Sequence, residues 1–244
     1  MNTIKEEFER QALLLGESAM DKLENAYVAL FGVGGVGSYA AEALARSGVG
    51  HILLVDCDRV SRSNINRQLC ALQSTVGQFK VDVVATRIRD INPDAIVECR
   101  RDFVLPDNIG SFDFAKFDFV IDAIDTVSAK ISIAEACIAV GTQLISCMGT
   151  GNKQNPTELK VTDISKTNTC PLARVMRREL KKRGISHLRV IYSEEEAMTP
   201  LKAVKSENGK AVPGSLAFVP SVAGLIAASE AVKHIISKEA SENG

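Results

Sequence analysis

The 244-residue sequence has no tryptophan, and aromatic residues make up only 5% of it. Stacking of bases on aromatic side chains is therefore not expected to dominate any contact with nucleic acid. The formal net charge is −1, with 29 Lys and Arg against 30 Asp and Glu, so the chain as a whole is no polyanion binder. This average still allows a local basic surface that acidic residues balance elsewhere.

Cys-x-x-Cys pairs are also missing, although the chain has six cysteines. Several of them, such as Cys57 and Cys147, lie within apolar runs. We expect small buried side chains in a reducing compartment, rather than a disulfide framework or a zinc ribbon.

Long uninterrupted apolar runs are absent as well. The segment that follows Met1 is charged and does not look like a secretory signal. The most apolar region, residues 216–231, is interrupted by Pro220 and Glu230, which favours a buried or interface helix over a membrane span. The sequence thus predicts a cytoplasmic protein with no integral membrane segment, and it leaves peripheral membrane contact of this helix open.

Short apolar runs do occur, and they alternate with helical patterns through the first 150 residues. The runs fit buried parallel strands, while the helical stretches carry apolar residues at three-to-four spacing. Strands are expected at residues 27–31, 51–55, 95–99, 117–123 and 143–147, and helices at residues 38–46, 76–91 and 128–139. This order predicts an α/β fold, in which a Rossmann-like, mostly parallel sheet has helices on both faces and a nucleotide at its C-terminal edge.

The pattern changes after Gly149, where an elaborated C-terminal part begins. We expect a half-exposed strand at residues 159–162, a basic helix at residues 172–183 and a second strand at residues 188–192. A loop at residues 193–215 and a closing helix at residues 220–237 follow. No repeat or linker separates this part from the rest. We therefore expect a single domain over residues 1–244, with a nucleotide-binding core at residues 22–150.

Four glycines stand between the first strand and the first helix, at Gly32, Gly34, Gly35 and Gly37. Glycine there allows a tight turn and a close approach of backbone N–H groups to phosphate. Asp56 ends the next strand about 20 residues later, where a carboxylate can accept hydrogen bonds from ribose hydroxyls. A glycine turn needed only for packing is the alternative. The loop predicts a nucleotide, but it does not distinguish NAD from ATP.

Residues further along the chain favour ATP. Arg67 and Lys80 would place cations near the phosphates, which hydride transfer does not need but release of pyrophosphate does. Asp125 follows the fourth apolar strand, at the sheet edge where an open α/β fold holds Mg²⁺. The sequence therefore predicts an enzyme that cleaves MgATP.

Together these motifs resemble the ThiF, MoeB and ubiquitin-activating superfamily, whose members adenylate carboxylates with MgATP. The motifs that match are the glycine loop, the pair Asp56 and Asp58, Ser-Asn-x-x-Arg-Gln from Ser63 to Gln68, Gly-Gln-x-Lys ending at Lys80, and Asp125. Arg10, followed by Gln and an apolar run, is similar to an N-terminal element of the superfamily. Residues 219–224 resemble its closing helix.

The resemblance implies roles for these residues. It implies an ATP site made of the four glycines together with Asp56, Asp58, Ser63, Asn64, Arg67, Gln68, Lys80 and Asp125. Arg67, Lys80, Asp125 and Arg10 would be the catalytic residues, with Asp125 as the ligand of Mg²⁺. Arg10 would reach the triphosphate of a neighbouring subunit, which implies a homodimer, and residues 151–244 would supply substrate and dimer elements.

Each of these roles has a simpler alternative. Arg67 could be a surface ion-pair partner, Lys80 a solvated helix residue, and Asp125 the N-cap of the following helix. Arg10 lies in a short charged segment, where an arginine needs no special role. Thr126 stands where the superfamily commonly has Asn after the metal-binding Asp, which puts only that neighbouring contact in doubt.

Zinc is not expected in this chain. Relatives that activate sulfur-carrier proteins usually hold zinc in two Cys-x-x-Cys pairs and carry a cysteine in the crossover loop. Here the corresponding place reads Cys170-Pro-Leu-Ala, and residues 193–215 contain no cysteine. A closed zinc site needs about four ligands. We expect Cys170 to serve packing, although a chemical role for it stays open.

Positive charge is concentrated between Lys166 and Arg189, where Glu179 is the one acidic residue. Helical spacing places several of these cations on one face, as binding to a phosphate backbone requires. The expected contacts with tRNA are Arg174, Arg177, Arg178, Lys181, Lys182 and Arg183. A solvated helix face is the alternative.

Within the superfamily, the chain most resembles one branch, the TcdA group of tRNA threonylcarbamoyladenosine dehydratases. Four features carry this resemblance: the missing zinc ligands, the missing crossover cysteine, the run Lys-Val-Thr-Asp-Ile from Lys160 and the basic helix. The resemblance implies that the threonyl carboxylate of the modified adenosine attacks the α-phosphate of ATP, giving an acyl-adenylate and pyrophosphate. A nucleophile in the same base then closes a ring and expels AMP. The partners implied are tRNA and, in some relatives, a sulfur-transfer protein.

Three other functions compete with this interpretation. An activating enzyme for a ubiquitin-like or sulfur-carrier protein would depend on a small protein with a C-terminal Gly-Gly. A binding module that only senses nucleotide has little use for cations at the leaving pyrophosphate. An NAD dehydrogenase explains the glycine loop but not Arg67, Lys80 and Asp125.

Overall fold

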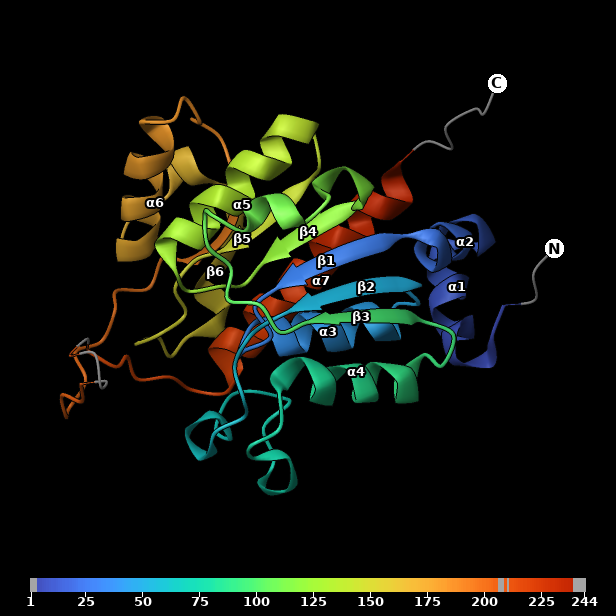
Figure 1. Cartoon of the computed structure of the whole chain (residues 1–244), viewed down its shortest axis with the longest axis horizontal. Helices are drawn as coiled ribbons and strands as arrows, with labels where there is room; N and C mark the ends of the chain where they lie inside the picture. Colours follow the sequence, from blue (N-terminus) through green and yellow to red (C-terminus); the bar gives the residue numbers. More distant parts are fainter. Residues whose placement is uncertain (1–3, 206–208, 210, 239–244) are drawn as a thin grey trace.

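A computed structural model describes residues 4–205, 209 and 211–238 of the chain. Within them, one sheet has the strand order β3-β2-β1-β4-β5-β7-β6 (Figure 1). The strands are β1 (Tyr27–Phe31), β2 (His51–Val55), β3 (Ile96–Arg100), β4 (Phe119–Asp122), β5 (Leu144–Cys147), β6 (Leu159–Asp163) and β7 (Arg189–Ser193). The α-helices are α1 (Glu9–Leu15), α2 (Glu17–Asn25), α3 (Gly37–Arg46), α4 (Lys80–Ile91), α5 (Val127–Val140), α6 (Pro171–Lys181) and α7 (Phe218–Ser237).

The strand pairs are parallel except for β6, which runs antiparallel to β7 at one edge. β1, β2, β4 and β5 are buried almost throughout, as continuous apolar runs predict for strands covered on both faces. Parallel pairing brings their carboxyl ends to one edge. The α/β fold expected from the sequence is therefore confirmed.

Helices cover both faces of the sheet. α3, α4 and α7 lie on one face, and α5 and α6 lie on the other (Figure 1). Alternate residues of β1 serve the two layers, because Leu30 belongs to the first core and Phe31 to the second. Phe31 packs edge-on against Phe112, with ring centroids 5.2 Å apart. These two cores hold the strand ends in place.

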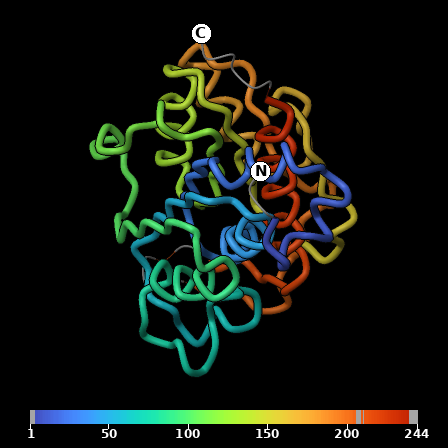
Figure 2. The backbone as a smooth tube through the Cα atoms, turned by 90° about the vertical axis from the view of Figure 1, so that its right-hand side faces the viewer, coloured from blue at the N-terminus to red at the C-terminus, as the bar shows by residue number. Residues whose placement is uncertain are grey.

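The C-terminal helix α7 packs against the N-terminal helix α2. α7 packs along α3 and also contacts β4 and α2, and in Figure 2 the red C-terminal helix lies next to the blue N-terminal segment. The Lys22 ammonium on α2 donates to the carbonyl of Ile236, 2.9 Å away. By length and composition α7 would suffice to cross a membrane, but 44% of its most apolar window is buried inside the protein, as in a core helix.

Several boundaries differ from those expected. The helix predicted at residues 76–91 begins only at Lys80, because Gly77 adopts φ +90° in a turn and Phe79 forms an isolated β-bridge with Arg59. The two N-terminal helices α1 and α2 were not anticipated by the pattern of residues 1–26. In the loop predicted at residues 193–215, Ser193 still belongs to β7, while residues 206–208 and 210 lie outside the described residues.

Candidate functional site

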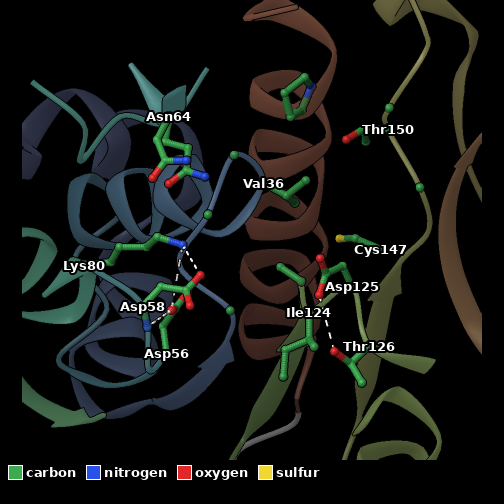
Figure 3. A pocket seen from close by; sticks show the side chains of 18 of the residues that line it. Val36, Asp56, Asp58, Asn64, Lys80, Ile124, Asp125, Thr126, Cys147 and Thr150 are labelled. Atoms are coloured by element: carbon green, nitrogen blue, oxygen red, sulfur yellow. Dashed lines mark hydrogen bonds and ion pairs between the residues drawn. The ribbon is translucent and has the colours of Figure 1, made fainter. Parts of the chain in front are cut away.

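A cavity of about 480 Å³ opens at the C-terminal ends of β1, β2, β4 and β5. Figure 3 shows Lys80 and Asn64 on one side of it and Cys147 and Thr150 on the other, with Asp125 on the latter side. The predicted residues that line it are Gly32, Gly34, Gly35, Asp56, Asp58, Asn64, Arg67, Gln68, Lys80 and Asp125. The structure thus gathers most of the expected ATP site at the expected edge of the sheet.

The glycine loop is shaped by close backbone contacts. Gly32 has φ +87°, and a Cβ there would stand 2.7 Å from the carbonyl oxygen of Ala123 after β4. A Cβ on Gly37 would overlap the carbonyl oxygen of Gly32, so Gly37 serves the turn and does not line the cavity. The loop leads directly into α3, whose N-terminal N–H groups suit an anionic ligand.

Asp56 ends β2 beside this loop. One of its carboxylate oxygens accepts the N–H of Val33 at 2.7 Å, and the other accepts the N–H of Asp58 at 2.8 Å. Burial raises the pKa of Asp56 above its ordinary value, although Lys80 and these two N–H donors oppose the rise. The carboxylate is therefore oriented by the backbone while it faces the cavity.

Lys80, the first residue of α4, is 5% exposed. Its ammonium lies 2.6 Å from a carboxylate oxygen of Asp58 and 3.9 Å from one of Asp56 (Figure 3). The alternative of a solvated helix residue is thereby excluded. Because the Lys80 ammonium is already desolvated and held by two carboxylates, it can bind an anionic ligand without a further loss of hydration.

Arg67 and Asn64 come from the segment between β2 and α4. The Arg67 guanidinium donates to the carbonyl of Ser63 at 2.8 Å and to the side chain of Asn66 at 3.0 Å. Among the described residues it forms no ion pair with a carboxylate, so the surface salt-bridge alternative finds no support. The side-chain oxygen of Asn64 accepts the N–H of Ser61, which closes the local turn.

Asp125 follows β4 and is exposed to the cavity. The N-cap of α5 is Thr126, without a side-chain capping bond, so Asp125 is not the cap. Its carboxylate accepts a weak hydrogen bond from the Thr126 hydroxyl at 3.4 Å (Figure 3). Within the part of the chain that the structure describes, this carboxylate has no ion pair, and a carboxylate oxygen is the donor type that Mg²⁺ prefers, so this residue fits the ion.

Besides Gly37, two other predicted residues lie outside the cavity wall. The Ser63 hydroxyl pairs with that of Ser61, and Ser63 is not part of the cavity wall. Arg10 is exposed on α1. The segment before α1 packs Phe8 against Gly48, close to the N-terminal end of β2 and thus at the edge opposite the cavity. The structure does not bring Arg10 into the cavity of its own chain.

The far wall of the cavity was not anticipated. It is formed by Cys147, Met148, Gly149, Thr150, Gly151 and Leu172, with Val212, Pro213 and Ser215 from the segment before α7. Burial raises the pKa of the Cys147 thiol to about 12, so that thiol is no nucleophile at neutral pH. For residues 147–151 of this wall, the available signal was their position at the end of β5, because parallel strands end at one edge of the sheet. Cys170 is buried outside this wall.

The basic helix α6 is amphipathic, and its cations differ in their surroundings. Arg177 turns inward: its guanidinium donates to the carbonyls of Ile164 and Thr167 at 3.3 and 2.8 Å. The cations on the exposed side are Arg174, Arg178, Lys181, Lys182 and Arg183. Of these, Arg178, Lys182 and Arg183 pair with Glu179. We therefore assign Arg177 a structural role and keep the others as a candidate surface.

Comparison with known proteins places this geometry in a family. The model of the ThiF family matches residues 8–244. The chain belongs to the ThiF family. It is 46% identical over 240 residues to the tRNA threonylcarbamoyladenosine dehydratase of Bacillus subtilis (strain 168), covering 94% of both chains. It is 36% identical over 256 residues to that of Escherichia coli (strain K12), covering 97% of this chain and 96% of the other.

Solved structures of this family agree with the fold. The E. coli dehydratase TcdA in complex with ATP superposes with a TM-score of 0.88 at 36% identity, and the match covers 100% of both chains. The same enzyme in complex with AMP gives a TM-score of 0.87. Both complexes are of a protein that this ThiF chain resembles over its whole length.

Proposed function

We propose that this protein is a tRNA threonylcarbamoyladenosine dehydratase, an ATP-dependent, ligase-like enzyme. The observation that carries the proposal is the full-length match to TcdA in complex with ATP, combined with the cavity in which Lys80, Arg67 and Asp125 meet the glycine loop. Substrate chemistry of this kind needs charge neutralisation and orientation more than a protein nucleophile. Among the described cysteines, only Cys57 and Cys147 line the cavity, and burial raises the pKa of both thiols.

In this mechanism the threonyl carboxylate of the modified adenosine attacks the α-phosphorus of ATP. The bond to the β-phosphate oxygen breaks, and pyrophosphate leaves with the negative charge that Lys80 and Arg67 stabilise. A nucleophile of the same base then attacks the acyl carbon of the adenylate, closes a ring and expels AMP. The sum is loss of one water from the base, with ATP converted to AMP and pyrophosphate.

Mg²⁺ would be held by Asp125, whose carboxylate faces the cavity and accepts a weak hydrogen bond from Thr126, because Mg²⁺ prefers oxygen ligands. Its contribution when bound would be further neutralisation of phosphate charge. Asp56 would accept hydrogen bonds from the ribose hydroxyls, because its carboxylate is already oriented by Val33 and Asp58. Gly32, Gly34 and Gly35 would let the backbone approach the phosphates.

The far wall suits the nucleoside substrate. Leu172, in the first turn of α6, contributes to this wall, and Arg174 and Lys181 on the same helix point to solvent. One rigid element would therefore contact the tRNA backbone and the reacting base together. Residues 151–244 would thus supply substrate elements, and residues 22–150 the nucleotide core.

We also infer a homodimer in the cytoplasm. The opposite positions of Arg10 and the cavity support it, because Arg10 can serve a triphosphate only in a second copy. Leu13 and Leu14 beside it are 85% and 86% exposed, as apolar residues of an interface are in a single chain. A sulfur-transfer protein is a further partner that the family raises, and co-purification with tagged protein would test it.

The deciding experiment combines protein, MgATP and tRNA and measures both pyrophosphate and the nucleosides by mass spectrometry. We expect pyrophosphate release only with tRNA that contains threonylcarbamoyladenosine, together with loss of one water from that nucleoside. Equal activity on unmodified tRNA would refute the proposal. Release that depends instead on a small protein ending in Gly-Gly would support an activating enzyme for a sulfur-carrier or ubiquitin-like protein.

A further inference from the structure

A fully buried ion pair joins α5 to the end of β4, the strand that leads into the cavity wall. Lys130 on α5 and Asp122 at the end of β4 are both 0% exposed, and the Lys130 ammonium stands 2.9 Å from a carboxylate oxygen of Asp122. Neither residue has a part in the mechanism above. A lysine and an aspartate in a dry interior lose their hydration, so a role other than packing is worth seeking.

The Lys130 ammonium has three partners. Besides Asp122, it donates to the hydroxyl of Ser146 at 3.3 Å and to the carbonyl of Cys147 at 2.8 Å. The Ser146 hydroxyl in turn donates to the same Asp122 oxygen at 2.5 Å. Asp122 and Ser146 are register partners across β4 and β5. The cluster therefore ties together the carboxyl ends of two adjacent strands.

The same cluster reaches the cavity on both strands. The second oxygen of Asp122 accepts the N–H of Ile124 at 3.1 Å, which fixes the turn that leads into Asp125. On β5, the carbonyl that Lys130 holds belongs to Cys147, a residue of the far wall. Ile124, Asp125 and Cys147 all line the cavity.

We propose that Lys130 is a positioning residue, which sets the turn carrying Asp125 against the end of β5. The proposal rests on the proposed function, because it assigns Asp125 to the ion that accompanies ATP. An apolar residue at position 130 could fill the same space, but it could not hold Asp122, Ser146 and the Cys147 carbonyl at once. A displaced turn would move the Asp125 carboxylate and leave the glycine loop in place.

Calorimetric titration with ATP tests the proposal on the whole protein, with Mg²⁺ and separately with EDTA. For Lys130→Met we expect the gain in ATP affinity that Mg²⁺ provides to fall at least about fivefold, whereas affinity in EDTA stays within about twofold. The double variant Asp122→Asn/Lys130→Met removes both charges. We expect it to regain thermal stability but not the Mg²⁺-dependent affinity.

A second pair of variants keeps the test valid if Lys130→Met does not fold. Ser146→Ala preserves both charges and removes one connection in the cluster, and the same reduction in the Mg²⁺-dependent gain is expected. Ser132→Ala is the matched control, since Ser132 is also buried on α5 and its hydroxyl lies outside the cluster. Equal gains in these two serine variants would overturn the proposal.

Two further results would also overturn it. A double variant with wild-type Mg²⁺-dependent affinity would mean that Lys130 only neutralises Asp122. A wild-type protein whose ATP affinity is the same with Mg²⁺ and with EDTA would mean that Asp125 holds no ion. The measurements of ATP affinity and of thermal stability do not use tRNA. Failure of the dehydratase proposal would therefore be seen in a separate experiment, as absence of pyrophosphate release from wild-type protein with modified tRNA.

Discussion

Lys80 is a buried cation whose nearest partner, Asp58, is 62% exposed on its side chain. In the proposed mechanism this asymmetry would matter, because the exposed Asp58 carboxylate could turn to solvent while the buried ammonium stays in the cavity wall. Desolvation of the site would strengthen the attraction between that ammonium and a departing pyrophosphate. Lys80 therefore combines a structural ion pair with a position in the cavity that the glycine loop also lines.

Replacing Lys80 with Met should lower kcat for pyrophosphate release by about 100- to 1,000-fold, as loss of one donor to a developing anion does. Steady-state kinetics with modified tRNA would measure it. Lys116→Met is the control, since Lys116 is 70% exposed and lies outside the cavity wall. A tenfold or smaller loss of kcat in Lys80→Met would contradict the assigned role.

Motif spacing identified the residues on one side of the cavity, but it identified neither the far wall nor the orientation of the side chains. The motifs placed Asp56, Lys80 and Asp125 at one sheet edge because parallel strands end together. Helical spacing put Arg177 on the basic face, yet the segment at Ile164 and Thr167 docks against it and engages its guanidinium. Such docking depends on tertiary contacts, which one sequence does not reveal.

Elements were predicted more accurately where burial alone decides them. The strands of the nucleotide core lie within two residues of expectation, because continuous apolar runs suit a sheet covered on both faces. The start of α4 was wrong by four residues, since the left-handed Gly77 interrupts a pattern that otherwise looks helical. The sequence did not predict the buried ion pair between Asp122 and Lys130, because a charged residue is normally expected to be exposed to solvent.

At the level of α6, we expect charge reversal of Arg174 and Lys181 to weaken tRNA binding and flatten its salt dependence. Both side chains are exposed, and each contact with phosphate releases counterions. Filter binding at several salt concentrations would show a slope lower by about 2, while ATP affinity is unchanged. Reversal of Lys116 is the control, and tRNA binding that matches it would indicate a merely solvated face.

α3 and α4 are linked by Glu42, whose carboxylate oxygens accept from Arg87 at 2.5 and 2.9 Å. Burial alone would raise the pKa of Glu42, but the hydrogen bonds from Arg87 and Arg46 outweigh it and lower that pKa. The stabilisation is therefore complete above the ordinary value of 4.5 and is lost as pH falls through the lowered value.

Glu42→Gln should accordingly reduce the free energy of unfolding by about 1 kcal/mol at pH 7. Urea unfolding at pH 7 and again in the acid range would measure the difference between variant and wild type. The difference should shrink as the solution becomes more acidic than the lowered pKa. A difference that is constant over this range would show that the carboxylate charge does not act through Arg87 and Arg46.

For the whole molecule, the separation of Arg10 from the cavity makes a prediction about mixed dimers. Arg10→Ala and Lys80→Ala should each be inactive alone. A mixed population should regain up to about a quarter of wild-type activity, because half of the dimers combine both variants and each of those has one intact site. Pyrophosphate release after co-expression would measure it. No recovery in dimers shown to be mixed would exclude action between subunits.

The place of α7 has a consequence for the order of events during synthesis. Pro220, in the first turn of α7, contributes to the cavity wall and lies against Gly35 of the phosphate loop. α7 also packs against α3, the helix that directly follows the glycine loop. A nascent chain that ends before residue 218 therefore has the glycine motif but not the surface that completes it. We therefore expect ATP binding to begin only once α7 has left the ribosome and packed against the loop.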